Sequence, residues 1–80
     1  MKCIQVQYFA VLREQAGCRE ERIETSADTT AALYRELCRR HGFTQPDEGL
    51  KVAINDDFTA WDAPLEDGIR VVFIPPFAGG

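Results

Sequence analysis

The residues of this chain best suited to chemistry are the two glycines that close the sequence, Gly79 and Gly80. Glycine has no Cβ atom, so a backbone that ends in two glycines can enter a channel too narrow for other residues. A terminal α-carboxylate is ionised at neutral pH. Such a slim carboxylate can attack the α-phosphate of ATP and become an activated acyl adenylate. The alternative is a frayed terminus without a role, because chain ends are commonly poorly ordered.

Two prolines precede these glycines and predict how the chain leaves its domain. Pro75 and Pro76 cannot donate hydrogen bonds to a β-ladder, so a strand must stop before them. Their fixed φ favours an extended path away from the domain. We therefore predict one domain over residues 1–76 and an extended tail over residues 77–80, which read Phe77-Ala78-Gly79-Gly80.

Other reactive residue types have weaker claims. His41, the only histidine, falls at a predicted helix end, where it would compensate the helix dipole. The three cysteines Cys3, Cys18 and Cys38 are widely spaced and odd in number, so neither a disulfide framework nor a zinc site is predicted, and no metal is expected. Unpaired thiols fit a reducing cytoplasm. A solvated acidic face is predicted for Glu14, Glu20, Glu21 and Glu24.

Length and composition restrict the class of protein. Eighty residues, 45% of them hydrophobic and 28% charged, indicate one small globular domain with little room for a deep cavity. Nine basic and 13 acidic residues give a net charge of −4, so no nucleic-acid partner is expected. No apolar run approaches the ~20 residues that span a bilayer, so no membrane association is expected either.

Apolar periodicity predicts the elements that position the tail. Strands are predicted over residues 2–9, 19–25, 50–54, 58–61 and 69–74, with one helical turn over 11–16. A helix begins after one of three candidate N-caps, ends near His41 and has Gly42 just beyond it. The candidate caps are Ser26, Asp28 and Thr29, and the predicted apolar stripe is Ala32, Leu33, Leu37 and Cys38.

Strands on both sides of one helix predict an α+β fold, a mixed sheet wrapped on one main helix. This order of elements is that of the ubiquitin-like β-grasp, one of several small α+β folds that it would fit.

The last predicted strand is apolar on both faces, which a sheet with one solvated face should not show. A single helix covers one face only, so Ile74 is predicted to lie on the uncovered face together with Phe9 and Phe58. Three large apolar side chains there favour a docking patch. The alternatives are scattered surface residues or loops that fold over this face.

Several segments resemble the small-subunit family of molybdopterin synthase, the sulfur carriers of molybdenum cofactor biosynthesis. The ending 73–80 resembles its F-x-P-P-x-x-G-G motif, and residues 6–14 are similar to its first strand and following turn. Residues 53–55 and 64–68 resemble its Val-Asn and Pro-Leu-x-Asp-Gly segments. The chain departs from the family at Ile69, where an acidic residue is common, at Tyr8, which replaces a Phe, and at Phe77, which replaces a smaller Val.

The resemblance implies a mechanism in which the chain is a reactant and not a catalyst on its own. A separate activating enzyme consumes ATP to adenylate Gly80, and a sulfur donor converts the adenylate to a thiocarboxylate. Sulfur then passes to a cyclic pyranopterin monophosphate on the synthase large subunit, within a heterotetramer and without a bound cofactor. The partner-binding residues would be Phe9, Phe58, Ile74, Pro75, Pro76, Phe77 and Ala78.

Three alternatives stay open at this point. A thiamine-type sulfur carrier would also end in Gly-Gly, although the Pro-Pro pair and the full length favour the molybdopterin family. A ubiquitin-like protein modifier would pass its carboxylate to a lysine amine. An interaction module with an inert tail would not need the glycines at all.

Overall fold

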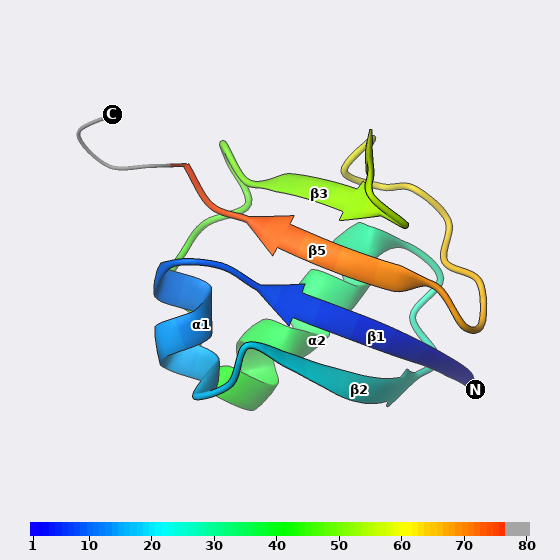
Figure 1. The fold of residues 1–80 in the computed structure, drawn as a ribbon, viewed down its shortest axis with the longest axis horizontal. Helices are drawn as coiled ribbons and strands as arrows, with labels where there is room; N and C mark the ends of the chain where they lie inside the picture. The colour runs from blue at the N-terminus through cyan, green and yellow to red at the C-terminus, as the bar shows by residue number, and fades with distance from the viewer. Residues whose placement is uncertain (77–80) are drawn as a thin grey trace.

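The computed structural model describes residues 1–76, and the predicted tail over residues 77–80 lies outside the described residues. Five strands form one mixed sheet in the order β2-β1-β5-β3-β4 (Figure 1). Along the chain the elements are β1 (Lys2–Tyr8), α1 (Val11–Ala16), β2 (Glu20–Thr25), α2 (Thr30–His41), β3 (Lys51–Ile54), β4 (Asp57–Thr59) and β5 (Arg70–Ile74). The predicted order of elements, including the single helical turn, is confirmed.

The centre of the sheet joins the first strand to the last. β1 pairs antiparallel with β2 and parallel with β5, from Gln5 opposite Arg70 to Tyr8 opposite Phe73. β5 in turn pairs antiparallel with β3. Parallel neighbours need a long crossover connection, and here α2 and the β3–β4 hairpin supply it. β5 therefore stops beside the end of β1, next to the start of the tail.

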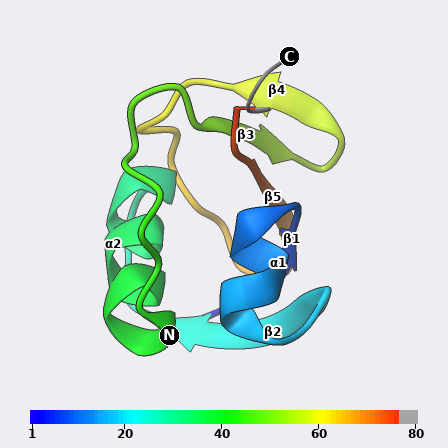
Figure 2. The same ribbon diagram turned by 90° about the vertical axis from the view of Figure 1, so that its left-hand side faces the viewer.

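Helix α2 lies against one face of the sheet, as Figure 2 shows from the side. The alternation predicted for β1 is confirmed, because Ile4, Val6 and Tyr8 are fully buried toward this helix. Val71 and Phe73 of β5 are buried in the same core. None of the helices in the described part of the chain is long and apolar enough to cross a membrane.

Both ends of α2 are capped. Of the three candidate N-caps, Thr29 is the one used, since its Oγ1 accepts a hydrogen bond from the Ala32 N–H at 3.1 Å. Gly42 has φ of +73° and donates its N–H to the Cys38 carbonyl at 2.8 Å. This left-handed conformation favours glycine at the position predicted for it.

The predicted apolar stripe of α2 is partly wrong. The buried face of α2 follows the helical period of three and four residues and consists of Thr30, Ala31, Leu33, Tyr34 and Leu37. Ala32, which was predicted in the stripe, is only half-buried. Sequence reasoning missed Tyr34 because a tyrosine fits a core or a surface equally well. The remaining predicted stripe residue, Cys38, is half-buried.

An aromatic cluster closes the core beside α2. Tyr34 packs against Phe43, Trp61 and Phe73 with ring centroids 5.2 to 5.9 Å apart. Trp61 was predicted in the strand over residues 58–61, but β4 ends at Thr59. The chain then turns across α2, where the Thr30 hydroxyl donates to the Trp61 carbonyl.

The prediction of a solvated acidic face is wrong at Glu21. Its carboxylate accepts a hydrogen bond from the Tyr8 hydroxyl at 2.6 Å and lies 2.5 Å from the His41 Nε2 atom. Glu21 stands opposite Val6 in the β1–β2 ladder, so it faces α2 rather than solvent. His41 is the last residue of α2, as predicted, but it also joins this helix to β2.

Candidate functional site

Strand register defines what the uncovered face of the sheet presents. Directly opposed residues share a face, and the row across the sheet runs Gln7, Val72, Ala53 and Phe58. Ile74 stands opposite Lys51 on the same face. The β1–β2 part of this face is polar, and its apolar part lies over β5, β3 and β4. Val71 and Val72 point to opposite faces of β5, and both are buried, at 0% and 7% exposed. The prediction that β5 is apolar on both faces is therefore confirmed.

A hollow marks the apolar end of this face. It has a volume of about 350 Å³ and is lined by Gly49, Lys51, Phe58, Ile74, Pro75 and Pro76. We call these six residues the tail-side surface, because Pro76 is directly followed by residue 77. The structure thus brings together four of the residues predicted to bind a partner, from β4, β5 and the segment after β5.

Phe58 is the large hydrophobic side chain that the tail-side surface exposes to solvent. It is 70% exposed, while Ile74 is half-buried. The Lys51 Nζ atom lies 5.9 Å from the centroid of the Phe58 ring. A cation over an aromatic face is attracted to it, so Lys51 holds a positive charge at this apolar patch. Sequence reasoning missed Lys51 because only the pairing of β3 with β5 places it beside Ile74.

The two prolines behave differently from each other. β5 ends at Ile74, as predicted, but Pro75 is buried while Pro76 is exposed. The Pro76 ring packs beside Gly49, where an added Cβ would lie 3.5 Å from Pro76 Cγ. Pro75 is therefore still packed on the fold, inside the domain predicted over residues 1–76.

Phe9 does not join the tail-side surface. It follows β1, is half-buried, and has the Arg13 guanidinium carbon 5.5 Å from its ring centroid. It does not line the hollow. The predicted site residues Phe77, Ala78, Gly79 and Gly80 lie outside the described residues.

The chemistry of the tail-side surface is that of docking. Lys51 is the only titratable side chain among its six residues, so the surface contains no pair of side chains for acid–base catalysis. Within residues 1–76, no group of His, Cys, Asp and Glu side chains could hold a metal ion. The surface can bury apolar area against a partner, and any covalent chemistry would need groups from elsewhere.

The fold and this surface together define a class of protein. A five-stranded mixed sheet, wrapped on one helix, with the last strand beside the first, is the ubiquitin-like β-grasp fold, as the sequence predicted. The protein-family model of the ThiS family matches residues 6–80, so this chain belongs to the ThiS family.

Known relatives agree in sequence and in fold. The molybdopterin synthase sulfur carrier subunit of Escherichia coli is 32% identical, over 96% of this chain and 99% of its own. A solved protein of Pyrococcus furiosus, assigned as molybdopterin converting factor subunit 1, is 30% identical over 96% of this chain and all of its own, with a TM-score of 0.77. By its name, the E. coli relative is one subunit of a synthase rather than a catalyst alone.

More distant structures share the fold. SAMP1 of Haloferax volcanii is 24% identical, with a TM-score of 0.78 over 98% of this chain and 99% of its own. Subunit 1 in a complex of subunits 1 and 2 of the molybdopterin-converting factor of Helicobacter pylori is also 24% identical. Its TM-score is 0.65, over 98% of this chain and 99% of its own.

Proposed function

We propose that this chain is the sulfur carrier subunit of a molybdopterin synthase, with Gly80 as its reactive carboxyl terminus. The observation that carries the proposal is the full-length similarity to the E. coli sulfur carrier subunit, at 32% identity. The F-x-P-P-x-x-G-G ending supports the position of the reactive group.

The proposed reaction has two activating steps. A carboxylate oxygen of Gly80 attacks the α-phosphorus of ATP on a separate activating enzyme, and pyrophosphate leaves. A sulfur donor then displaces AMP from the acyl adenylate and leaves a thiocarboxylate on Gly80. Two successive thiocarboxylates supply the two sulfur atoms of the molybdopterin dithiolene, which forms from cyclic pyranopterin monophosphate. The thiocarboxylate on Gly80 is used up in each sulfur transfer and must be formed again, so the chain acts as a reactant.

The tail-side surface is the proposed dock for the large subunit. Phe58, Ile74, Pro75 and Pro76 would be buried there, and Phe9, Phe77 and Ala78 remain proposed partner-binding residues. A heterotetramer of two carriers on a large-subunit dimer is proposed. The partner would supply the basic groups that bind the substrate phosphate, since the tail-side surface itself offers only Lys51.

The test is the intact mass of the chain purified from cells that make molybdenum cofactor. We expect a fraction heavier by the mass difference between sulfur and oxygen, located in the C-terminal peptide and lost on mild hydrolysis. Treatment with ATP, an activating enzyme and a sulfur donor should raise this fraction. A chain that forms no thiocarboxylate under those conditions would contradict the proposal.

The co-purifying partner separates the proposed pathway from its neighbours. A molybdopterin synthase large subunit supports the proposal, whereas a thiazole-forming partner would assign the chain to the thiamine-type carriers. Isopeptide adducts between Gly80 and lysines of other proteins would assign it to the ubiquitin-like modifiers.

A further inference from the structure

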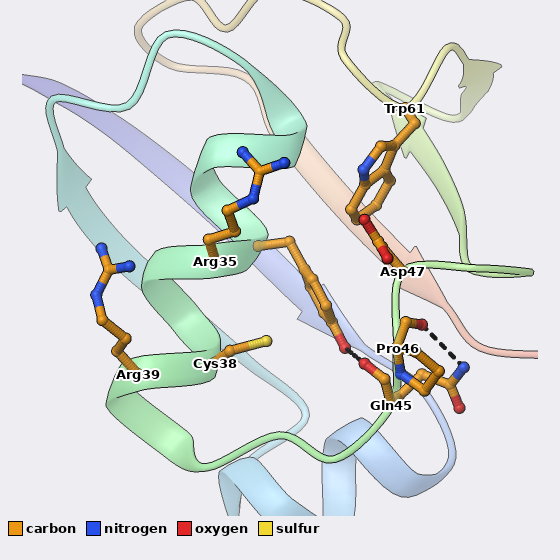
Figure 3. Close-up of a pocket in the computed structure, with 8 residues that line it drawn as sticks. Arg35, Cys38, Arg39, Gln45, Pro46, Asp47 and Trp61 are labelled. Atoms are coloured by element: carbon orange, nitrogen blue, oxygen red, sulfur yellow. Dashed lines mark hydrogen bonds between the residues drawn. The ribbon is translucent and has the colours of Figure 1, made fainter.

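A second hollow lies beside α2 and is lined in part by residues of this helix (Figure 3). It has a volume of about 330 Å³, between α2, residues 45–47 and Trp61. This volume falls at the lower end of the range for small-molecule sites, about 300–1,000 Å³. The hollow is therefore large enough for one small ring system.

Two aromatic rings, those of Tyr34 and Trp61, form part of the wall of this hollow. The Tyr34 and Trp61 rings meet edge to face, with centroids 5.4 Å apart. The Tyr34 hydroxyl donates to the Gln45 carbonyl at 2.6 Å, which joins α2 to the opposite wall. Burial raises the pKa of Tyr34, so this phenol stays neutral and keeps donating to Gln45. A planar ring would find a preformed apolar surface here.

The polar groups of the hollow are mostly donors. The Trp61 Nε1 atom is buried and has no hydrogen-bond acceptor among the described residues. Figure 3 shows this nitrogen on the ring edge turned toward α2, with the Arg35 guanidinium extending on the same side. Neither Arg35 nor Arg39 takes part in the four ion pairs found within residues 1–76.

The charge of the lining favours a negative ligand. Asp47 is the only acidic residue that lines the hollow, against Arg35 and Arg39. Cys38 also lines it, and burial raises the pKa of this thiol, so Cys38 adds no negative charge. A ligand must therefore offer acceptors to Arg35 and to the Trp61 N–H. Charged acceptors make the stronger hydrogen bonds with a guanidinium group.

We propose that this hollow binds a small planar organic anion, of the aromatic carboxylate class. Its carboxylate is held by Arg35 and by the Trp61 N–H, and its ring lies against Tyr34 and Trp61. This site shares no lining residue with the tail-side surface, and it does not depend on the sulfur carrier function.

The test uses the single tryptophan of the chain, whose indole N–H gives one signal in a ¹⁵N-correlated NMR spectrum. The probe is 2-naphthoate, and its neutral control is 2-naphthamide. We expect 2-naphthoate to shift the Trp61 indole signal in a saturable way. The amide should bind roughly tenfold more weakly, because it lacks the charge that strengthens the hydrogen bonds to Arg35.

Two variants locate the site. Arg35→Gln should weaken 2-naphthoate binding roughly tenfold, whereas Arg22→Gln, at an exposed arginine of β2, should leave it unchanged. Equal binding of the acid and the amide, an unaffected Arg35→Gln variant, or shifts confined to Phe58 and Ile74 would each overturn the proposal. So would the lack of a saturable shift at millimolar probe.

Discussion

Ile74 is the residue through which docking can be tested most directly. Its side chain is half-buried beside the exposed Phe58 ring, so a polar replacement remains partly solvated in the isolated chain. In a complex the same carboxylate would be desolvated without a partner charge. We expect Ile74→Asp to weaken large-subunit binding by about 2 kcal/mol, roughly 30-fold, in a calorimetric titration.

A matched variant shows whether the added charge acts through its position. Ser26 is exposed in the connection between β2 and α2, outside the tail-side surface. Ser26→Asp should therefore leave the affinity unchanged. Equal affinities for wild type and Ile74→Asp would remove Ile74 from the proposed dock.

Tyr8 makes stability depend on alkaline pH. Burial, the hydrogen bond to Glu21 and the charge of Glu21 raise the pKa of this phenol well above its ordinary value of 10.0. Above about pH 10 the unfolded chain releases this proton while the folded chain keeps it, so the free energy of unfolding falls as pH rises. Tyr8→Phe removes this contribution.

The measurement is urea unfolding at a series of pH values from neutral to strongly alkaline. Tyr8→Phe should show a shallower loss of unfolding free energy above about pH 10 than wild type. The pKa of Tyr34 is also raised, so some alkaline loss should remain in the variant. An unchanged slope would mean that Tyr8 does not hold its proton in the folded state.

At the scale of elements, the start of α2 allows the contribution of the N-cap residue Thr29 to be compared with that of its neighbour Asp28. Thr29 accepts the hydrogen bond from Ala32 N–H, whereas Asp28 points to Lys2 Nζ at 3.3 Å with its side chain 91% exposed. We expect Thr29→Ala to lower the free energy of unfolding by about 1 kcal/mol. Asp28→Ala should cost less, because exposed ion pairs contribute little. Denaturant unfolding compares the two, and a larger loss for Asp28→Ala would contradict this assignment.

The sequence predicted the helices and strands better than it predicted which of them lie side by side. Alternation in β1, the turn over α1 and the glycine after α2 are local signals, so each could be read from a few residues. The parallel pairing of β1 with β5 joins distant segments, so no local pattern reveals that Lys51 stands beside Ile74. Glu21 was misread for the same reason, since its partners come from β1 and from the end of α2.

At the scale of the molecule, the fold and the proposed chemistry occupy different parts of the chain. The hydrophobic core consists of residues between Ile4 and Phe73, whereas the proposed reactive group is Gly80. We expect deletion of Gly80 to abolish thiocarboxylate formation and to leave the thermal midpoint unchanged. Mass spectrometry and calorimetry would measure the two effects.

Leu37→Ala is the opposite control, because Leu37 is fully buried in the core. It should lower the free energy of unfolding by about 2–5 kcal/mol, a large part of the stability of a small domain. Sulfur charging of the fraction that stays folded should persist. If the chain that lacks Gly80 still supports molybdopterin synthesis, the proposed mechanism is wrong.

The central position of β5 in the sheet affects how the chain folds during its synthesis on the ribosome. Without β5, the sheet divides into a β2–β1 hairpin and a β3–β4 hairpin, and isolated hairpins are marginal in water. A ribosome delivers β1 first and β5 last, so a nascent chain must wait for residues 70–74 before the two halves join. A prematurely terminated chain is left with exposed strand edges, which makes it a target for chaperones and proteases. Formation of the complete sheet therefore requires the synthesis of residues 70–74, so every folded chain contains β5.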